Sequence, residues 1–361
     1  MAYKMIQVGT GGFGSVWCGG ILPPAVREGL VEVVAAVDIN PEALKNAQKD
    51  LGLPAEKCYT DINRAFDENP ADFCTVVVPP AFHENVVDVA LAHKMHILSE
   101  KPIADTLEVA IRINEKVRRA NVKMAVTMSH RFDQDKYSFE SELHSGKYGK
   151  LDYLVCRSIS QLRNYGAWGG PFRHEMESPM LIEGGVHHFD ILRNLAGDKC
   201  DTVYATTWTP PWGEYKGDCQ ALVSMIFQNG VKALYEGTRA NAAGLNTFGQ
   251  KYIRAECEKA TLILSQRKLE RFLYQADIDS RTEGQGEQIP LLEQNKWAHS
   301  WLFEQFIHWL DGGSPMKTNV QDNLQSLAIN FAAVESSRTG SPVRVQEYLK
   351  RIRNSVMGEG L

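Results

Sequence analysis

The sequence lacks the features that mark membrane and secreted proteins. No uncharged apolar run is long enough to cross a bilayer, and the N-terminus has neither the apolar core nor the cleavage site of a secretory signal. The seven cysteines lie far apart without a C-x-x-C pair, which argues against a disulfide framework and favours reduced thiols. We therefore expect a cytoplasmic protein without a membrane partner.

A surplus of positive charge is also missing. The net charge is −5 with both signs interspersed, so no basic stripe is available for a nucleic-acid backbone, and nucleic acid is not an expected partner. Low-complexity tracts and repeats are absent as well. The 43% of hydrophobic and 23% of charged residues are typical of globular proteins, and 361 residues indicate two domains rather than one.

Strand-like and helix-like segments alternate through the first third of the chain. The strand-like runs lack polar alternation, which is typical of parallel strands buried on both faces. They cover 4–8, 31–37, 73–78, 96–99 and 122–127, with helices expected from near 12 and over 41–51, 82–94 and 106–120. This pattern predicts an α/β domain with a doubly wound parallel sheet over residues 1–127.

The pattern changes in residues 128–361. Helices are expected over 133–145, 180–195, 296–310 and 321–338, and a strand over 151–160. Asn229-Gly230 between two β-type runs, 221–227 and 231–235, indicates a hairpin. We expect a substrate-binding α+β domain with an open, mostly antiparallel sheet, which also serves as the surface of a homo-oligomer.

A glycine turn stands between the first strand and the first helix. Its pattern is G-x-G-x-x-G, formed by Gly9, Gly11 and Gly14, with Gly12 and Phe13 inside the turn. The glycines allow a tight turn, and the helix N-terminus offers N–H groups to a pyrophosphate, as in Rossmann domains. The turn therefore predicts a bound dinucleotide.

Asp38 ends the second strand-like run, where a carboxylate can accept hydrogen bonds from a ribose diol. The same carboxylate would repel a 2′-phosphate, and no Arg or Lys follows closely, so we expect NAD rather than NADP. The alternative is a surface carboxylate that caps the helix at Pro41.

Glu100 and Lys101 follow the strand over 96–99, at the edge where open α/β sheets bind ligands. Pro102 keeps Lys101 out of the helical region. The alternative is a solvated ion pair in a loop.

Glu183 and His187 are four residues apart in an expected helix, so they share a face. A carboxylate beside an imidazole orients it and raises its basicity, as a general base requires. One alternative is a purely structural pair. Another is a metal site, but no third ligand is apparent in the sequence, and we expect no metal.

At these residues the sequence resembles the glucose-fructose oxidoreductase and inositol dehydrogenase (Gfo/Idh/MocA) family over nearly the whole chain. The resemblance rests on the glycine turn, Val78 to His83, Glu100 to Pro102, and Glu183 to Asp190. Arg131-Phe132 and the segment from Ser336 to Val343 also look like this family's.

The resemblance implies roles for several residues. Pro79 and His83 would lie along the dinucleotide, Glu100 and Lys101 would border the nicotinamide, and Lys101 would also touch the substrate oxygen. His187 would be the catalytic base. The family usually has Asp where this chain has Glu183, and Trp-Arg where it has Phe172-Arg173. The substrate-binding residues that we expect are Lys101, Arg131, Trp168, Arg173, Glu183 and His187.

The expected reaction is oxidation of a secondary hydroxyl, with His187 as base and Lys101 stabilising the developing alkoxide. Aromatic residues such as Trp168 in the second domain suit a sugar, cyclitol or glycoside, or else simply pack a sheet. Three alternatives remain: glycoside cleavage or epimerisation through transient oxidation, a non-catalytic regulator that binds NAD and sugar, and reduction of an unsaturated or tetrapyrrole-like substrate.

Overall fold

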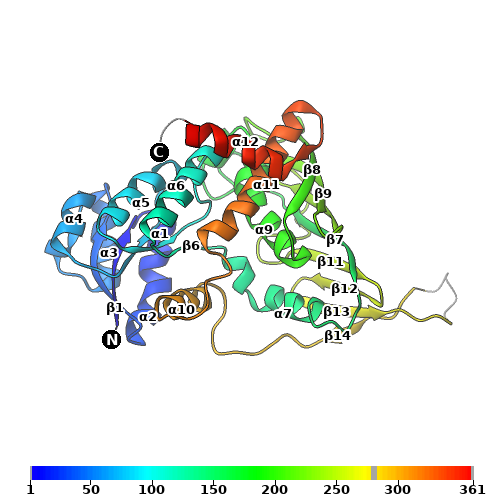
Figure 1. Ribbon diagram of the computed structural model, residues 1–361, viewed down its shortest axis with the longest axis horizontal. Helices are drawn as coiled ribbons and strands as arrows, with labels where there is room; N and C mark the ends of the chain where they lie inside the picture. Colours follow the sequence, from blue (N-terminus) through cyan, green and yellow to red (C-terminus); the bar gives the residue numbers. More distant parts are fainter. Residues whose placement is uncertain (1, 278–282, 359–361) are drawn as a thin grey trace. The chain divides into compact units, whose positions relative to one another are not determined.

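The computed structural model describes residues 2–277 and 283–358, which form two compact units (Figure 1). The first unit comprises Met1–Ser129, Lys296–Leu324 and Arg353–Leu361, and the second His130–Asn295 and Gln325–Ile352. This division differs from the predicted single boundary after residue 127, because two later segments pack with the first unit.

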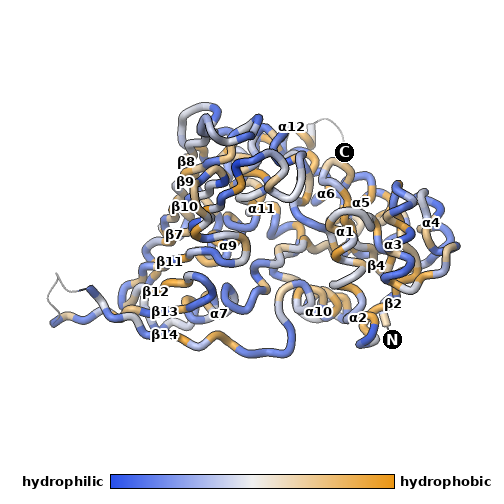
Figure 2. Tube along the Cα trace, turned by 180° about the vertical axis from the view of Figure 1, so that it is seen from behind, coloured by the Kyte–Doolittle hydropathy of each residue, from blue (hydrophilic) through white to orange (hydrophobic). Residues whose placement is uncertain are grey.

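The first unit is built on a parallel sheet with the strand order β3-β2-β1-β4-β5-β6. The central strands are buried on both faces, as their unbroken apolar runs predict, and Figure 2 shows β2 and β4 as mainly hydrophobic stretches. The doubly wound fold is therefore confirmed. The strands are β1 (Tyr3–Val8), β2 (Val31–Val37), β3 (Cys58–Tyr59), β4 (Phe73–Val76), β5 (His96–Ser99) and β6 (Met124–Val126).

Helices connect these strands, and their ends follow local signals. Asn40 caps α3 by accepting a hydrogen bond from the Glu42 N–H, and Pro41 occupies the first turn. Asn121 ends α6 in the left-handed conformation with φ 52°. The helices are α1 (Phe13–Val16), a π-helical turn η1 (Trp17–Ile21), α2 (Leu22–Arg27), α3 (Pro41–Leu51), η2 (Ala55–Lys57), α4 (Ile62–Glu68), η3 (Pro80–Phe82), α5 (His83–Ala92) and α6 (Leu107–Ala120).

Helix α10 (Ala298–Leu310) belongs to the first unit although it comes late in the chain. It lies beside α2 in Figures 1 and 2. Phe303 and Phe306 place their ring centroids 6.1 and 5.3 Å from that of Phe73 on β4. The apolar face of α10 therefore completes the core of the first unit, and this long-range packing explains the difference from the predicted boundary.

The second unit is built on a nine-stranded sheet with the order β14-β13-β12-β11-β7-β10-β9-β8-β15. All pairings are antiparallel except that of β7 with β10, and the predicted hairpin at Asn229-Gly230 joins β9 to β10. The mostly antiparallel sheet is thus confirmed. Its strands are β7 (Leu151–Ile159), β8 (Cys200–Trp208), β9 (Gln220–Phe227), β10 (Lys232–Thr238), β11 (Tyr252–Cys257), β12 (Ala260–Ser265), β13 (Lys268–Leu273), β14 (Glu287–Ile289) and β15 (Val343–Arg344).

Helices pack against this sheet, and α9 crosses β7 and β10. The Phe189 ring on α9 meets that of Tyr235 on β10 edge to face, with centroids 5.1 Å apart. The remaining helices are η4 (Ser129–Phe132), α7 (Gln134–Leu143), α8 (Phe172–Glu175), a π-helical turn η5 (Met180–Gly184), α9 (Gly185–Ala196), α11 (Val320–Thr339) and α12 (Val345–Gly358).

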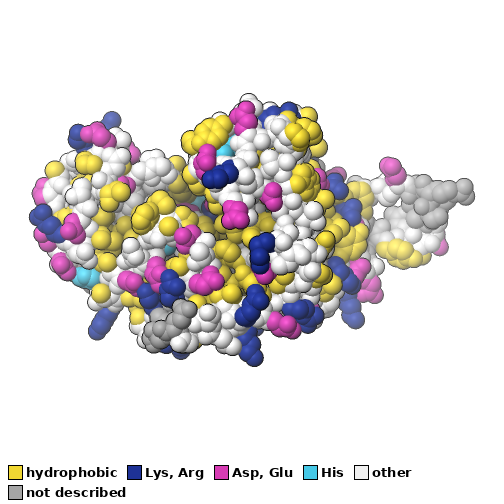
Figure 3. All heavy atoms as spheres, turned by 90° about the horizontal axis from the view of Figure 1, so that it is seen from above, with side chains coloured by type: hydrophobic (Ala, Val, Ile, Leu, Met, Phe, Trp, Pro, Cys, Tyr) yellow, Lys and Arg dark blue, Asp and Glu magenta, His cyan; other side chains and the backbone are white. Residues whose placement is uncertain are grey.

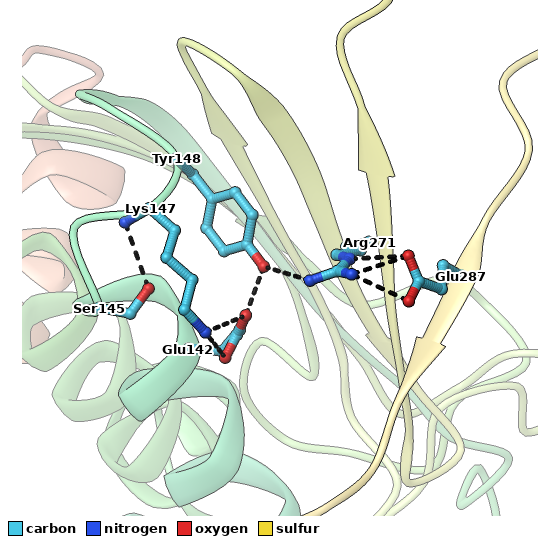
Figure 4. A network of polar contacts seen from close by, with 6 residues as sticks. All are labelled: Glu142, Ser145, Lys147, Tyr148, Arg271 and Glu287. Atoms are coloured by element: carbon cyan, nitrogen blue, oxygen red, sulfur yellow. Dashed lines mark hydrogen bonds and ion pairs between the residues drawn. The ribbon is translucent and has the colours of Figure 1, made fainter.

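A polar network ties the loop after α7 to the far edge of the sheet (Figure 4). The Tyr148 hydroxyl donates a hydrogen bond to Glu142 and accepts one of 3.5 Å from Arg271 on β13. The Arg271 guanidinium in turn binds both carboxylate oxygens of Glu287 on β14. These contacts fix the strand pair β13–β14 against the helical side of the unit.

The surface carries charges of both signs. On the face shown in Figure 3, Lys and Arg side chains are interspersed with Asp and Glu side chains. None of the helices in the described part of the chain has both the length and the apolar character that a bilayer crossing requires. All seven cysteines are free thiols, as predicted.

Candidate active site

The carboxyl ends of β1, β4 and β5 lie in register at one edge of the first sheet. Val8 pairs with Val76, and Val76 with Ser99. The Val77 N–H donates to the Val8 carbonyl, and the Glu100 N–H to the Val76 carbonyl, both at 2.8 Å. The glycine turn and the Glu100-Lys101 segment therefore leave the sheet at its ligand-binding edge.

The backbone of the glycine turn, residues 9–14, forms a cradle in which a side chain at Gly9 or Gly14 would clash. Gly9 has φ +87°, and a Cβ atom there would lie 2.0 Å from the Val77 carbonyl oxygen. A Cβ atom on Gly14 would lie 2.4 Å from the Gly9 carbonyl oxygen, where α1 begins. Because the backbone reaches this close approach only without side chains, these residues fit the pyrophosphate of a dinucleotide.

Asp38 lies against this turn and is not the side-chain cap of α3, which is Asn40. Its Oδ2 accepts hydrogen bonds from the backbone N–H groups of Thr10 at 2.7 Å and Gly11 at 2.9 Å. Its Oδ1 accepts one from the Asn40 N–H at 2.9 Å. The carboxylate is thus held beside the cradle, where the ribose of a dinucleotide is expected.

Replacing Asp38 by Ser should weaken NAD binding by about 10- to 100-fold, because hydrogen bonds to a charged acceptor are lost. NADP binding should change much less, since the lost carboxylate also repels the 2′-phosphate. Calorimetric titration of both dinucleotides measures this difference, with Asp61→Ser at the cap of α4 as the control. An equal loss for the two dinucleotides would mean that Asp38 only braces the turn.

Glu100 and Lys101 follow β5 directly. The Glu100 side chain is 9% exposed, and its Oε1 accepts a hydrogen bond of 3.0 Å from the indole Nε1 of Trp17 in η1. Its Oε2 accepts one of 3.2 Å from the Lys101 N–H. The Glu100 carboxylate is therefore held against η1, the π-helical turn that follows α1. The peptide bond between Lys101 and Pro102 is cis.

His83 is held by the backbone on both sides of its ring, and its expected place along the dinucleotide stays a prediction. Its imidazole is fully buried, with Nε2 2.8 Å from the Val78 carbonyl oxygen and Nδ1 3.1 Å from that of Ile103. Burial lowers the pKa of this imidazole. It therefore braces the backbone before Pro79, which is itself exposed and available to a ligand.

A residue that sequence reasoning missed, His299 on α10, packs against the same cradle. Its ring lies 5.9 Å from that of Phe13 and 6.3 Å from that of Trp17. Burial lowers the pKa of His299, and the nearby Glu100 carboxylate opposes this effect. No motif marks this residue, because its neighbours are nearly three hundred positions earlier in the chain.

In the second unit, three of the predicted substrate residues come together. Glu183 in η5 accepts hydrogen bonds from Arg173 Nη2 at 2.7 Å and Nε at 3.1 Å. Arg173 Nη1 donates to the Trp168 carbonyl at 3.1 Å, and its guanidinium lies 5.9 Å from the Trp168 ring. The Glu183 carboxylate is thus paired with an arginine of α8, which also contacts Trp168 in the preceding loop.

His187 lies one turn later, in α9, and is 7% exposed. The ring of His130 stacks on it with centroids 4.2 Å apart, and the Phe248 ring lies 6.4 Å away. Burial lowers the pKa of His130 far below its usual range, and His187 adds to this effect. The predicted base therefore stands on a neutral aromatic platform that sequence reasoning did not identify.

Arg131 pairs with Asp190 inside the second unit. Its Nε and Nη2 each bind one oxygen of this buried carboxylate at 2.5 Å, and Nη1 donates to Asn194 at 3.1 Å. This bidentate pair anchors η4 to α9. Substrate binding by Arg131 stays a prediction, and the contacts give the residue a structural role.

Comparisons with known proteins agree with both units. The family model described as "Oxidoreductase family, NAD-binding Rossmann fold" matches residues 4–128. The companion model, "Oxidoreductase family, C-terminal alpha/beta domain", matches residues 141–345. Together these matches span most of the chain.

Individual relatives extend this finding. An uncharacterized protein, y4oX of Sinorhizobium fredii, is 50% identical over 98% of both chains. D-apiose dehydrogenase of Rhizobium rhizogenes is 24% identical over 87% of this chain and 90% of its own. The crystal structure of an Agrobacterium radiobacter oxidoreductase with NAD+, L-tartaric acid and magnesium has the same fold, with a TM-score of 0.81, 24% identity and coverage of 96% of this chain and 99% of that one. The chain is a member of the Gfo/Idh/MocA oxidoreductase family and binds NAD through its Rossmann domain.

Proposed function

We propose that this protein is an NAD-dependent dehydrogenase that oxidises a secondary hydroxyl of a sugar, cyclitol or glycoside to a ketone. The relative named D-apiose dehydrogenase supports a sugar-like substrate, and the structural relative with NAD+ and L-tartaric acid supports a small hydroxyl-bearing one. The observation that carries the proposal is the place of His187, a nearly buried imidazole stacked on His130.

His187 is the general base of the proposed reaction and takes the hydroxyl proton. An imidazole suits this step because its usual pKa lies close to neutral pH. The stack with His130 fixes the plane of the ring, and the near-complete burial of His187 limits water around it. Glu183 is a positioning residue, held by Arg173 at the start of the same helical segment.

Lys101 polarises the substrate oxygen and stabilises its developing negative charge. Its place after β5, at the edge that carries the glycine cradle, supports this role. NAD, held by the cradle and Asp38, would supply the hydride acceptor. The residues proposed to hold it are Gly9, Gly11, Gly12, Phe13, Gly14, Asp38, Pro79, His83, Glu100 and Lys101.

The direct test is NADH formation with purified protein over a panel of pyranoses, inositols and glycosides, followed by absorbance. We expect reduction of NAD by at least one member, with much weaker use of NADP. Failure to reduce even enzyme-bound NAD in a single turnover would favour the alternative of a non-catalytic regulator.

The same panel separates net oxidation from glycoside cleavage or epimerisation. Transient oxidation returns the bound cofactor to its starting state, so product would form without accumulating NADH. Product analysis beside the absorbance trace therefore distinguishes the two reactions.

We also propose that the outer face of the second sheet joins copies of this chain. Five large apolar side chains on β8, β9 and β10 are exposed there: Tyr204 41%, Trp208 37%, Leu222 50%, Ile226 47% and Leu234 54%. Cross-strand pairing places Tyr204 and Leu234 on either side of Ser224, so the apolar residues share one face. An exposed apolar patch of this kind suits a two-fold contact with a second copy.

Replacing Leu222 and Leu234 by Glu should therefore dissociate the oligomer, because an apolar contact between copies would have to bury charge. Sedimentation equilibrium measures the mass, with Val26→Lys on α2, another exposed apolar position, as the control. A wild-type protein that is already monomeric would refute this assignment of the sheet face.

A further inference from the structure

Two buried cations of the second unit meet at one hydroxyl group. Ser158 lies fully buried on β7, and its Oγ accepts hydrogen bonds from Arg239 Nη1 at 3.3 Å and Lys251 Nζ at 3.2 Å. Arg239 is 5% exposed and Lys251 is 2% exposed. Positive charge is thus concentrated at a single point inside the unit.

No carboxylate compensates this pair among the described residues. The other acceptors of Arg239 Nη1 are the carbonyl oxygens of Ser158 and Thr238, while the buried Nε has no hydrogen-bond partner in the described chain. The nearby buried Lys136 differs, because it has Asp133 at 3.0 Å and Asp135 at 3.1 Å. A buried charge without a partner destabilises a fold, so a functional reason for this pair is expected.

The cation pair borders the residues already placed at the site. The Arg239 guanidinium lies 4.7 Å from the centre of the Trp168 ring, and Lys251 Nζ lies 5.2 Å from that of Phe248. A Cβ atom on Gly184, next to Glu183, would lie 3.1 Å from Arg239 Nη2. Phe248 also contacts the rings of His130 and His187. Lys251 and the proposed base His187 therefore both lie against the Phe248 ring.

We infer that Arg239 and Lys251 form a subsite for a carboxylate, so that the substrate of this dehydrogenase is a hydroxy acid of the sugar-acid class. The inference rests on the proposed function and deepens it. A carboxylate can accept a hydrogen bond from the unpaired Nε of Arg239 and supplies the missing negative charge. A neutral sugar would leave both cations without a partner.

The subsite also has a pH signature. Burial, together with the positive charges of Arg239 and Lys136, lowers the pKa of Lys251 to about 7, while Cys156 and Asp133 oppose this shift. A bound carboxylate favours the charged amine, so binding above pH 7 takes up a proton. The affinity for an acid should therefore be greatest below pH 7 and fall as the pH rises, whereas that for a neutral sugar should not.

The experiment compares matched acid and neutral substrates: D-glucuronate with D-glucose, and D-galacturonate with D-galactose. Wild-type protein should show the higher kcat/KM for the acid. Arg239→Met and Lys251→Met should raise KM for the acid by about 10- to 100-fold, the usual loss for a hydrogen bond to a charged group, and leave the neutral partner nearly unchanged. Lys150→Met, at an exposed position, is the control, and Lys251→Arg should keep the acid preference.

Thermal unfolding and NAD binding verify that the variants are folded. Equal use of acid and neutral substrates, or equal losses for both in the variants, would overturn the subsite and leave the dehydrogenase proposal standing. If neither class reduces NAD, the proposed function fails separately. In that case, calorimetric titration of the two sugar acids into the NAD-loaded protein tests the subsite directly. The subsite is overturned if wild-type protein does not bind the acids, or if wild type and Arg239→Met bind them equally well.

Discussion

His187→Ala should lower kcat by a factor of about 10² or more, the usual contribution of a positioned general base. The variant keeps the cradle and Asp38, which belong to the first unit, so NAD affinity should be unchanged. The loss should appear in the chemical step, because the neighbouring imidazole of His188 is already bound to the Tyr235 hydroxyl through a 2.7 Å hydrogen bond and does not replace the lost proton acceptor.

Steady-state rates and the pH profile of kcat/KM together provide the measurement. The fall of kcat/KM at acid pH should disappear when the base is removed. A merely structural defect would instead lower kcat/KM by the same factor at every pH. His187→Asn retains most of the side-chain volume and should be as inactive as the Ala variant. His144→Ala removes an exposed imidazole from the same unit and should behave as wild type. Turnover within a few-fold of wild type in both His187 variants would contradict the assignment of the base.

The sequence predicts the cofactor cradle well because its signal is local. The glycine turn, the end of β2 and the end of β5 each follow a buried strand, and parallel strands bring their carboxyl ends to one edge. Asp38 therefore meets Gly11 although the two are 27 residues apart, as the motif requires. Glu183 and His187 lie in consecutive helical elements, but Glu183 is in the π-helical turn η5 rather than in the expected α-helix, so their sharing of one face stays a prediction.

The parts of the site that the sequence did not reveal depend on long-range packing. His299 reaches the cradle only because α10 packs with the first sheet. Arg239 and Lys251 lie at the end of one strand and before another, where a cation normally indicates a solvated strand end. Their burial follows from the pairing of β7 with both β10 and β11, and no pattern along the chain encodes that neighbourhood.

Lys101→Met should lower kcat by about 10² to 10³, the loss seen when one donor to a developing oxyanion is removed. The charge acts on the oxygen as it loses its proton, so the loss should exceed any change in KM. The side chain starts from a well-fixed backbone, because the Lys101 N–H donates to the Glu100 carboxylate and Glu100 is itself held by Trp17. Met retains the length and apolar stem of Lys, which limits the change to the ammonium group.

Lys49→Met, at the exposed last turn of α3, is the matched control and should leave kcat unchanged. Lys101→Arg tests geometry separately from charge, since a planar guanidinium cannot place its charge where a compact ammonium does, and it should recover only part of the rate. If kcat stays near the wild-type value while the KM for NAD rises, Lys101 is a cofactor-binding residue. Another group then polarises the substrate oxygen. If both parameters stay near wild type, the segment after β5 takes no part in the reaction, and the ligand-binding edge of the first sheet serves NAD alone.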